Sequence, residues 1–409
     1  ILASNKGNNA RVLEHLLSYA DYQFGQHVAG NKYRERSDGQ RIDNWNVDIG
    51  ILLEISKRIV NIYHKNPSLS TLVRDNNVFP HLERSLHILS PWMVTIDSDA
   101  INQYNSVSFE GTNFLLEKSA NTEGNMAEVA MNRNQFSVAE GHCHRCLAHS
   151  RKLGVEGEEK TTTIFQALDA YVVLRQNQCD FSGALTFAEE AYNICVDAYD
   201  PVHPQVQEAA GILINSLIHK GDLFNAERFA DQTYANLRDI KNGMDQEGEE
   251  VAMGAFNLAD VILRQDDGDL IKAEKLARES LLIRTRLYSS NHCRVGSSCQ
   301  LLGRVLLNHG KLGDETKELL ERSLAIDVVN EGLDGPNTAL GNTFIGQFHC
   351  KLATMQSVIS IKRTQLLLAK SYAEEAVRIV TKIHHNPNDP ISVAAASLLS
   401  NILRELSTV

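Results

Sequence analysis

The densest group of reactive side chains in the sequence is His142-Cys143-His144-Arg145-Cys146, followed by His149. Thiolates and imidazoles are the ligands that Zn²⁺ prefers, and a CxxC spacing is common in zinc sites. On a helix, His142, Cys146 and His149 fall within about 60° of one another, so they could face one ion. A single helix cannot surround a tetrahedral ion, and no second CxxC stands elsewhere in the sequence. We therefore predict no bound metal and no cofactor.

Signatures of the common catalytic sites are missing from the sequence. Gly310-Lys311 is followed by leucine, so it is not a phosphate-binding P-loop, and GxSxG, HExxH and GxGxxG motifs do not occur. Acidic pairs such as Glu249 and Glu250, or Asp267 and Asp269, stand at expected helix starts and turns, where carboxylates cap the helix dipole or are solvated. The sequence favours a protein that is not an enzyme, although an active site assembled from distant parts of the chain would leave no local motif.

The stretch from Cys293 to Glu331 predicts two helices folded back on each other. Its first half contains Leu302-Gly303-Arg304-Val305-Leu306-Leu307, with apolar residues at helical spacing, and stops at Gly310, which tolerates the left-handed conformation that ends many helices. In its second half, apolar residues such as Leu320 and Leu324 lie on one helical face. Two short helices cannot bury such faces alone, so this unit needs copies of itself.

The copies are visible as columns of small residues. The residue that opens each expected second helix is small and recurs every 42 to 53 residues, at Ala139, Ala184, Ala226, Ala273, Thr316 and Ala369. Four residues further along stand Cys143, Ala188, Ala230, Ala277, Leu320 and Ala373. Small side chains recur where two backbones approach closely, and bulky residues between them fill the space between helices. The columns therefore predict six helix pairs.

This pattern resembles the tetratricopeptide repeat, whose first helix carries a Leu-Gly pair and whose second helix opens and closes with alanines. Leu302-Gly303 and Ile345-Gly346 stand where that pair belongs, and Gly221-Asp222 makes the turn. The long period, with linkers such as Asp200-Pro201-Val202-His203-Pro204, is similar to that of the kinesin light chain repeats. The resemblance covers the chain from about residue 125 onward. It implies an all-α fold, a right-handed superhelical solenoid of helix-turn-helix repeats.

Residues 1–118 show apolar stripes at helical spacing but lack the repeat columns, so we predict a helical N-terminal segment of degenerate or armadillo-like repeats. The polar stretch from Thr95 to Asn125 is the expected linker. Residues 119–409 form the predicted repeat domain, with about six helix pairs and a capping helix from Ile391 to Glu405. The first 118 residues show none of the sustained heptads that a kinesin light chain carries, which argues against a motor function.

Composition restricts the partners and the compartment. The chain has 409 residues, of which 43% are apolar, and its net charge of −11 disfavours nucleic acid and anionic membranes, because both need a basic surface. No apolar run approaches the ~18 residues that span a bilayer. The seven cysteines are odd in number and stand mostly at small-residue helix positions, which predicts reduced thiols in a cytoplasmic or nuclear protein.

The repeats also predict a binding surface. Stacked helix pairs expose one side of each first helix on an inner wall, and solenoids use such walls to bind other chains. The side chains expected there include Asn215, Asn257, Arg264, Gln300, Arg304, Asn308 and Lys351. Amide side chains can pair with a peptide backbone, and arginine and lysine attract carboxylates. We hypothesise a scaffold or adaptor that binds an extended, net-acidic peptide.

A second hypothesis is a co-chaperone whose groove clamps a C-terminal carboxylate. Asn215 and Asn257 match the two asparagines of that family, but Gly211, Ser297 and Leu301 stand where its lysines and arginine belong. The charge that would hold a carboxylate is therefore missing. A metal-dependent or otherwise enzymatic protein is the third hypothesis and the least favoured.

Overall fold

The computed structural model describes residues 109–132, 134–154, 157–240, 248–383 and 390–408. These residues form thirteen helices and contain no strand, so the predicted all-α class is confirmed. The apolar stripes expected before residue 109 lie outside the described residues. None of the described helices combines the length and the apolar character that a membrane crossing requires.

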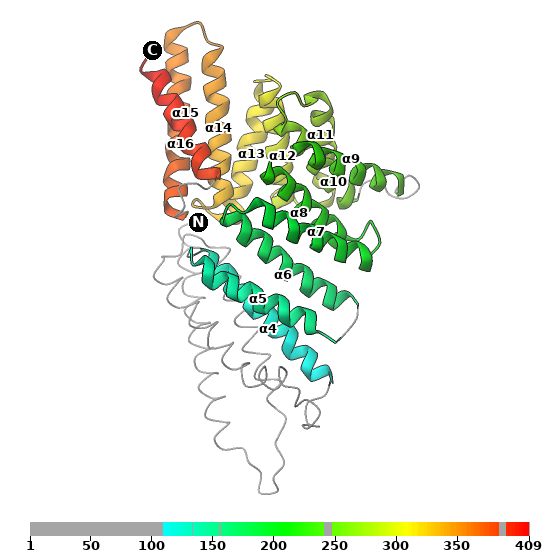
Figure 1. Ribbon diagram of the computed structural model, residues 1–409. Helices are drawn as coiled ribbons and strands as arrows, with labels where there is room; N and C mark the ends of the chain where they lie inside the picture. The colour runs from blue at the N-terminus through cyan, green and yellow to red at the C-terminus, as the bar shows by residue number, and fades with distance from the viewer. Residues whose placement is uncertain (1–108, 133, 155–156, 241–247, 384–389, 409) are drawn as a thin grey trace. The chain divides into compact units, whose positions relative to one another are not determined.

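The chain divides into two compact units, Ile1–Ala198 and Tyr199–Val409. The described helices of the first unit are α4 (Phe109–Asn132), α5 (Phe136–Lys152), α6 (Glu158–Asn177) and α7 (Phe181–Ala198) (Figure 1). Those of the second unit are α8 (Pro204–Lys220), α9 (Leu223–Ile240), α10 (Glu249–Arg264), α11 (Leu270–Leu287), α12 (Cys293–Asn308), α13 (Asp314–Glu331), α14 (Pro336–Thr354), α15 (Ile359–Ile383) and α16 (Pro390–Leu406) (Figure 1).

Within each unit the helices pack as consecutive helix-turn-helix pairs. α4 packs on α5 and α6 on α7 in the first unit, and α8 on α9, α10 on α11, α12 on α13 and α14 on α15 in the second. In the second unit, each second helix also contacts the first helix of the next pair, as α11 contacts α12. This is the repeating contact pattern of a helical solenoid, as predicted. The stretch Cys293 to Glu331 forms the expected hairpin as α12 and α13.

Small residues set the distance between paired helices. The six residues that open the second helices, Ala139, Ala184, Ala226, Ala273, Thr316 and Ala369, are at most 1% exposed. Leu320 is the bulky exception in the next column, and Gly303 of α12 lies opposite it. A Cβ added to Gly303 would lie 2.7 Å from Leu320 Cδ2. The Leu-Gly pair is therefore a packing requirement, because the missing side chain makes room for a leucine.

Glycines end two of the first helices in the left-handed conformation. Gly221 follows α8 with a φ of 82°, and Gly310 follows α12 with a φ of 77°. A residue with a Cβ is strained in this region, which explains why glycine stands at these turns. Both positions were predicted from the sequence.

Two of the first helices, α8 and α12, are preceded by a tyrosine and a histidine that are four residues apart. The imidazoles of His203 and His292 each accept a hydrogen bond at 3.2 Å from the backbone N–H two residues further on. Each ring also stacks on a tyrosine, with centroids 4.1 Å apart for Tyr199 and His203 and 4.2 Å apart for Tyr288 and His292. The Pro/His linkers noted in the sequence thus contain an N-cap that fixes where α8 and α12 start.

The linker expected at Thr95 to Asn125 is wrong for its described part, because α4 begins at Phe109. Few bulky residues stand here because α4 packs closely on α5. Ser119 is 1% exposed and bonds to His149 of α5, and a Cβ added to Gly124 would lie 3.7 Å from Cys146 Sγ. Small polar residues can be buried when their hydrogen bonds are satisfied. The boundary proposed at residue 119 falls inside this helix, and the division into two domains there stays a prediction.

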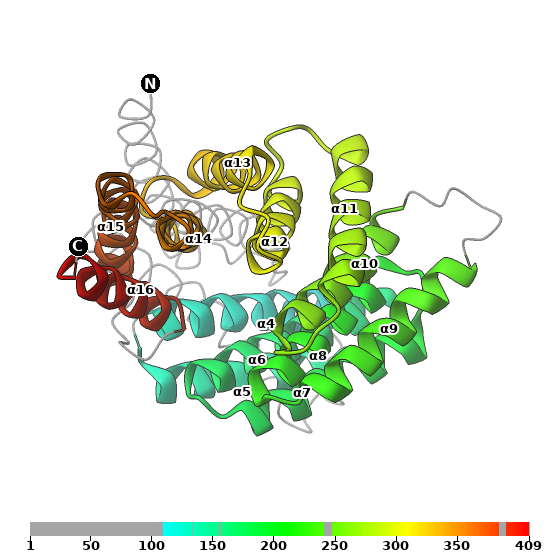
Figure 2. The ribbon, with the colours of Figure 1, turned by 90° about the horizontal axis from the view of Figure 1, so that it is seen from above.

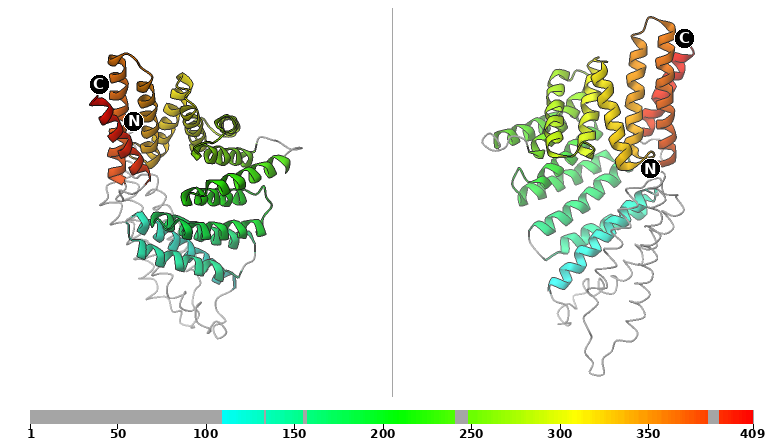
Figure 3. Two further views of the ribbon diagram at one scale, coloured as in Figure 1. Left: turned by 45° about the horizontal axis from the view of Figure 1, so that its top comes forward. Right: turned by 180° about the vertical axis from the view of Figure 1, so that it is seen from behind.

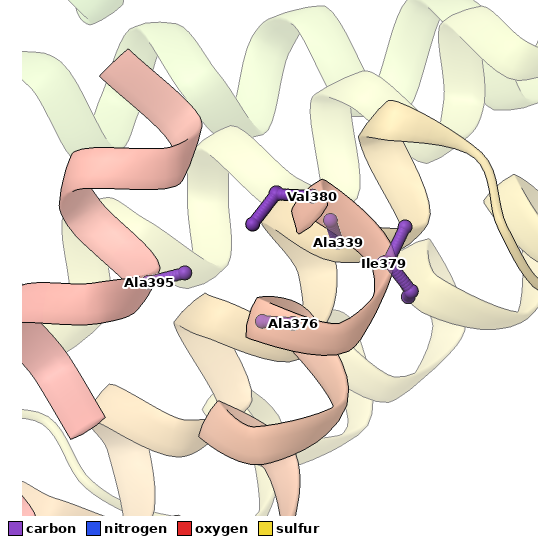
Figure 4. Close-up of a cluster of buried hydrophobic side chains, with 5 residues drawn as sticks. All are labelled: Ala339, Ala376, Ile379, Val380 and Ala395. Atoms are coloured by element: carbon purple, nitrogen blue, oxygen red, sulfur yellow. The ribbon is translucent and has the colours of Figure 1, made fainter. Parts of the chain in front are cut away.

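α16 packs on the last helix pair. One buried cluster joins Ala339 of α14, Ala376, Ile379 and Val380 of α15, and Ala395 of α16 (Figure 4). Both views in Figure 3 show α16 beside α15. α16 contacts α14 and α15 as α12 contacts α10 and α11, so it occupies the place of a first helix. Its role as a terminal cap stays a prediction.

All seven cysteines lie in the described residues and are free. Four of them, Cys143, Cys146, Cys195 and Cys299, are buried between helices. They pack as small residues there, as the column pattern indicates.

A buried carboxyl group in α13 should make stability depend on pH. Burial, together with the nearby charge of Glu331, raises the pKa of Asp327 to about 7, and a hydrogen bond from Ser323 only partly offsets this. Between about pH 4 and pH 7 the unfolded chain loses this proton while the folded chain keeps it, so stability falls as pH rises. Asp327→Asn should therefore stabilise the protein by roughly 2 kcal/mol at pH 8 and have little effect at pH 4.

Urea denaturation at both pH values measures this difference. The exposed Asp266→Asn is the matched control, and we expect no pH-dependent change from it. An equal effect of Asp327→Asn at pH 4 and pH 8 would contradict the assignment.

Candidate peptide-binding surface

The first helices of the second unit lie next to one another. α8 contacts α10, α10 contacts α12 and α12 contacts α14. In Figure 2, the first helices α12 and α14 lie along one side of the row of helix pairs, and the second helices α13 and α15 lie along the other side. The name first-helix surface is used below for Asn215, His219, Asn257, Asp260, Arg264, Gln300, Arg304, Asn308, Phe344, Gln347 and Lys351, which are exposed or half-buried.

The buried residues align these helices with one another. Leu258, Leu302 and Ile345 are at most 1% exposed and take the same place in α10, α12 and α14. Two residues beyond each, and beyond Leu213 of α8, the first column contains Asn215, Asp260, Arg304 and Gln347. Four residues further, the second column contains His219, Arg264, Asn308 and Lys351. Successive members of a column are 45, 44 and 43 residues apart. Two columns of polar side chains thus cross four helices.

Arg304 is held from two sides. Its Nη1 donates to Asp260 Oδ1 at 3.0 Å, and its Cζ lies 4.9 Å from the centroid of the Phe344 ring. Asp260 Oδ2 also accepts a hydrogen bond from Arg264 Nε at 2.8 Å. Burial alone would raise the pKa of Asp260, but the charges of Arg304 and Arg264 hold it below its usual value. The guanidinium of Arg304 is therefore charged and fixed in one orientation.

Lys351 joins the second column across two helices. Its Nζ donates to the backbone carbonyl of Leu307 at 3.1 Å and to Asn308 Oδ1 at 3.3 Å. Burial lowers its pKa. A lysine has three N–H donors, so these two bonds leave one for a partner.

The remaining predicted residues lie at different positions along the axes of their helices. Asn215 is exposed in the first column, whereas Asn257 is half-buried one turn earlier in its own helix. A Cβ added to Gly211 would lie 3.4 Å from Asn257 Nδ2, so this amide lies close to α8. Gln300 is half-buried one turn before Arg304. Burial lowers the pKa of His219, and Arg264 lowers it further.

The charge of this surface differs from the expected one. The sequence indicates a basic lining of Arg264, Arg304 and Lys351, but Asp260 binds both arginines. Asp260 was not among the residues expected on this surface, although it follows Leu258-Ala259 as Arg304 follows Leu302-Gly303, so its column position could be found from the sequence. The named surface carries three cations, Arg264, Arg304 and Lys351, and one carboxylate, Asp260. Its net charge is therefore positive, and the excess positive charge lies on α12 and α14.

The histidines and cysteines of α5 contact protein groups instead of converging on one point. His142 Nδ1 lies 2.5 Å from Glu123 Oε2, and His149 Nδ1 lies 3.1 Å from the hydroxyl of Ser119. Burial raises the pKa of Cys146 to about 12, which disfavours the thiolate that binds metals. No group of three or more His, Cys, Asp or Glu side chains in the described residues is placed to hold a metal ion. The absence of a bound metal stays a prediction.

Glu249 stands in the first turn of α10, as expected, but it is not simply solvated. Its Oε1 accepts hydrogen bonds from Nε and Nη2 of Arg284, at 3.2 Å and 3.1 Å, and from Nη1 of Arg294 at 2.5 Å. The Arg284 side chain is only 5% exposed. Arg284 stands in the column of Cys195 and Val380, both buried, so the column pattern could have revealed a buried charge. This ion group joins α10, α11 and α12.

The repeated helix pairs define the class of the protein, a tetratricopeptide-like helical repeat protein. No family model matches the chain, and no curated protein matches it.

Several solved structures are similar in fold. BtubC (BKLC) from P. vanneervenii is 21% identical over 63% of this chain and 94% of its own, with a TM-score of 0.45. A putative kinesin light chain from P. anserina with nearly identical TPR-like repeats is 17% identical over 54% of this chain and 97% of its own, with a TM-score of 0.38. A Rap protein complexed with competence and sporulation factor is 14% identical over 99% of both chains, with a TM-score of 0.47.

Proposed function

We propose that this protein is an interaction scaffold that binds an extended segment of a partner protein on its first-helix surface. The observation that carries the proposal is the pair of polar columns crossing α8, α10, α12 and α14. Solenoids bind extended chains because each repeat offers one set of contacts at a regular spacing. The proposal includes no catalytic step.

Arg304 supports a partner with acidic side chains. Its stacking on Phe344 and its bond to Asp260 fix the guanidinium before any partner arrives. Fixed donors lose little entropy on binding, and an arginine can hold a carboxylate with two hydrogen bonds. Lys351 has an N–H donor to spare on the next first helix.

The amides of the surface supply contacts to the partner's backbone. Asn215 is exposed, and Asn257 and Gln300 are half-buried, so they remain within reach of a bound chain. An amide side chain both donates and accepts, which matches a peptide group in an extended segment. In the proposed complex these residues bind the backbone, and Arg264, Arg304 and Lys351 bind carboxylates.

A charge-reversal experiment tests this surface. Peptides selected from a random dodecapeptide display library against the wild-type protein should be rich in Asp and Glu. Arg264→Glu combined with Lys351→Glu should weaken their binding at least tenfold, since about 1.4 kcal/mol lost over two contacts suffices. Both residues are exposed, and the bond between Arg304 and Asp260 stays in place. Wild-type affinity should also fall as salt rises.

A matched double variant controls for the change in net charge. Lys275→Glu with Lys317→Glu makes the same change on the second helices α11 and α13, where both residues are exposed. We expect this control to bind the selected peptides like the wild type. Equal affinities of the two double variants would place the binding surface elsewhere.

The carboxylate-clamp alternative gains no support from the structure. Leu301 is 1% exposed, and the hydroxyl of Ser297 donates to the carbonyl of Cys293 in its own helix. Gly211 has no side chain to offer. The positions where that family holds its cations thus supply none.

A further inference from the structure

One side of α16, called its outer side here, is not covered by any of the described helices. α16 sits on α14 and α15 as a first helix, and no second helix within the described ranges packs on it. Three of its 17 residues, Ala395, Leu398 and Ile402, are buried, whereas α12 buries ten of 16. Figure 4 shows the side chain of Ala395 in the cluster shared with α14 and α15, on the opposite side of the helix.

The uncovered side is apolar or small along its length. The name α16 outer face is used for Val393, Ala396, Ser397, Ser400 and Leu403, all of which are exposed. Val393 is 48% and Leu403 is 47% exposed, and with the small residues between them they form one uncharged face. Their spacing of three and four residues places them on one side of the helix.

We propose that the α16 outer face pairs with the same face of a second copy of this chain, in a symmetric antiparallel helix pair. The face is self-complementary about Leu398. In an antiparallel pair centred there, Val393 of one copy meets Leu403 of the other, and Ala396 meets Ser400. Apolar residues thus meet at both ends, and small residues meet in the middle, where the two backbones can approach closely.

Charge favours a second copy at this place. The chain carries a net charge of −11, so two copies repel over most of their surfaces. From Pro390 to Leu403, however, the sequence contains no charged residue. Arg404 follows and donates from Nη2 to Asn401 Oδ1 of its own helix at 3.2 Å. Two acidic chains can therefore approach along α16 without opposing carboxylates.

Two more exposed apolar side chains lie where α15 begins, near the end of α16. Lys362 Nζ lies 3.5 Å from Glu405 Oε2, which places the first turn of α15 beside the last turn of α16. Val358 is 50% and Ile359 is 66% exposed at this end. In the proposed pair, the Val393 end of the second copy's helix would lie there, so these side chains enlarge the buried area.

Molar mass in solution tests the proposal. Light scattering on the full chain should give twice 45.5 kDa for the wild type. Ala396→Glu places a carboxylate in the middle of each helix face and should raise the dissociation constant of the dimer at least tenfold. Ala235→Glu makes the same substitution at an exposed position of α9 and should leave the dimer unchanged. Helical circular dichroism should be alike for all three proteins.

Cysteine crosslinking tests the orientation. A mixture of Ala396→Cys chains and Ser400→Cys chains should form more interchain disulfide than either variant alone, because position 396 faces position 400 only in the antiparallel pair. Wild-type protein serves as the background for its native thiols. A monomeric wild type, an Ala396→Glu variant that stays dimeric, or equal crosslinking in all mixtures would each overturn the proposal.

Discussion

Glu249→Ala is expected to lower the free energy of unfolding by about 3 kcal/mol, because it leaves the buried guanidinium of Arg284 without its carboxylate. Arg284 is enclosed by α10, α11 and α12. Its Nη1 also donates to Ser298 Oγ at 3.1 Å, and its Cζ lies 5.0 Å from the centroid of the Phe256 ring. Neither contact neutralises the charge, so the desolvation of the guanidinium would remain uncompensated.

Two further variants distinguish the contribution of the buried Arg284 to stability from that of the exposed Arg294. Arg294 is 44% exposed, so Arg294→Ala should cost less than about 1 kcal/mol although it bonds to the same carboxylate. Arg284→Met in the Glu249→Ala background removes the unpaired charge and should restore part of the stability, since apolar side chains of similar size often replace buried ion pairs. Urea denaturation measures all four proteins. A loss below about 1 kcal/mol for Glu249→Ala would show that water reaches Arg284.

Gly303→Val should destabilise the protein by about 3 kcal/mol through overpacking against Leu320. A Cβ at residue 303 would lie 2.7 Å from Cδ2 and 2.9 Å from Cγ of that leucine, which is 2% exposed and cannot turn into solvent. Leu320→Ala alone should also destabilise, by about 2–4 kcal/mol, because it leaves a cavity. Together the two substitutions exchange equal volumes across the helix pair, so the double variant should lose less than about 1.5 kcal/mol.

The double-mutant cycle is the measurement, since it isolates the coupling between the two residues. Gly313→Val is the control for valine in place of glycine. Its backbone has a φ of −89°, which valine can adopt, and an added Cβ would meet nothing within 4 Å. Additive losses for Gly303→Val and Leu320→Ala would refute the proposed complementarity.

The sequence alone determined the helix pairs and their turns. The alternation of small and bulky residues gave the second helices their buried sides, and Gly221 and Gly310 marked helix ends because left-handed backbone favours glycine. These features depend on neighbours within one or two turns, so they can be found from a single chain. The same local reasoning failed at α4, where Ser119 and Thr122 resembled a linker but are buried in a helix contact.

Only the tertiary structure decided which polar groups are partners. Asp260 and Arg304 are 44 residues apart and Glu249 and Arg284 are 35 apart, in helices that meet through packing. The sequence places each residue on its helix but leaves open its rotation and height relative to the next helix, and a shift of one turn changes its neighbour. Packing of residues such as Gly303 against Leu320 fixes both quantities. Helix packing thereby determines that Asp260 forms ion pairs with Arg264 and Arg304 and partly neutralises their positive charge.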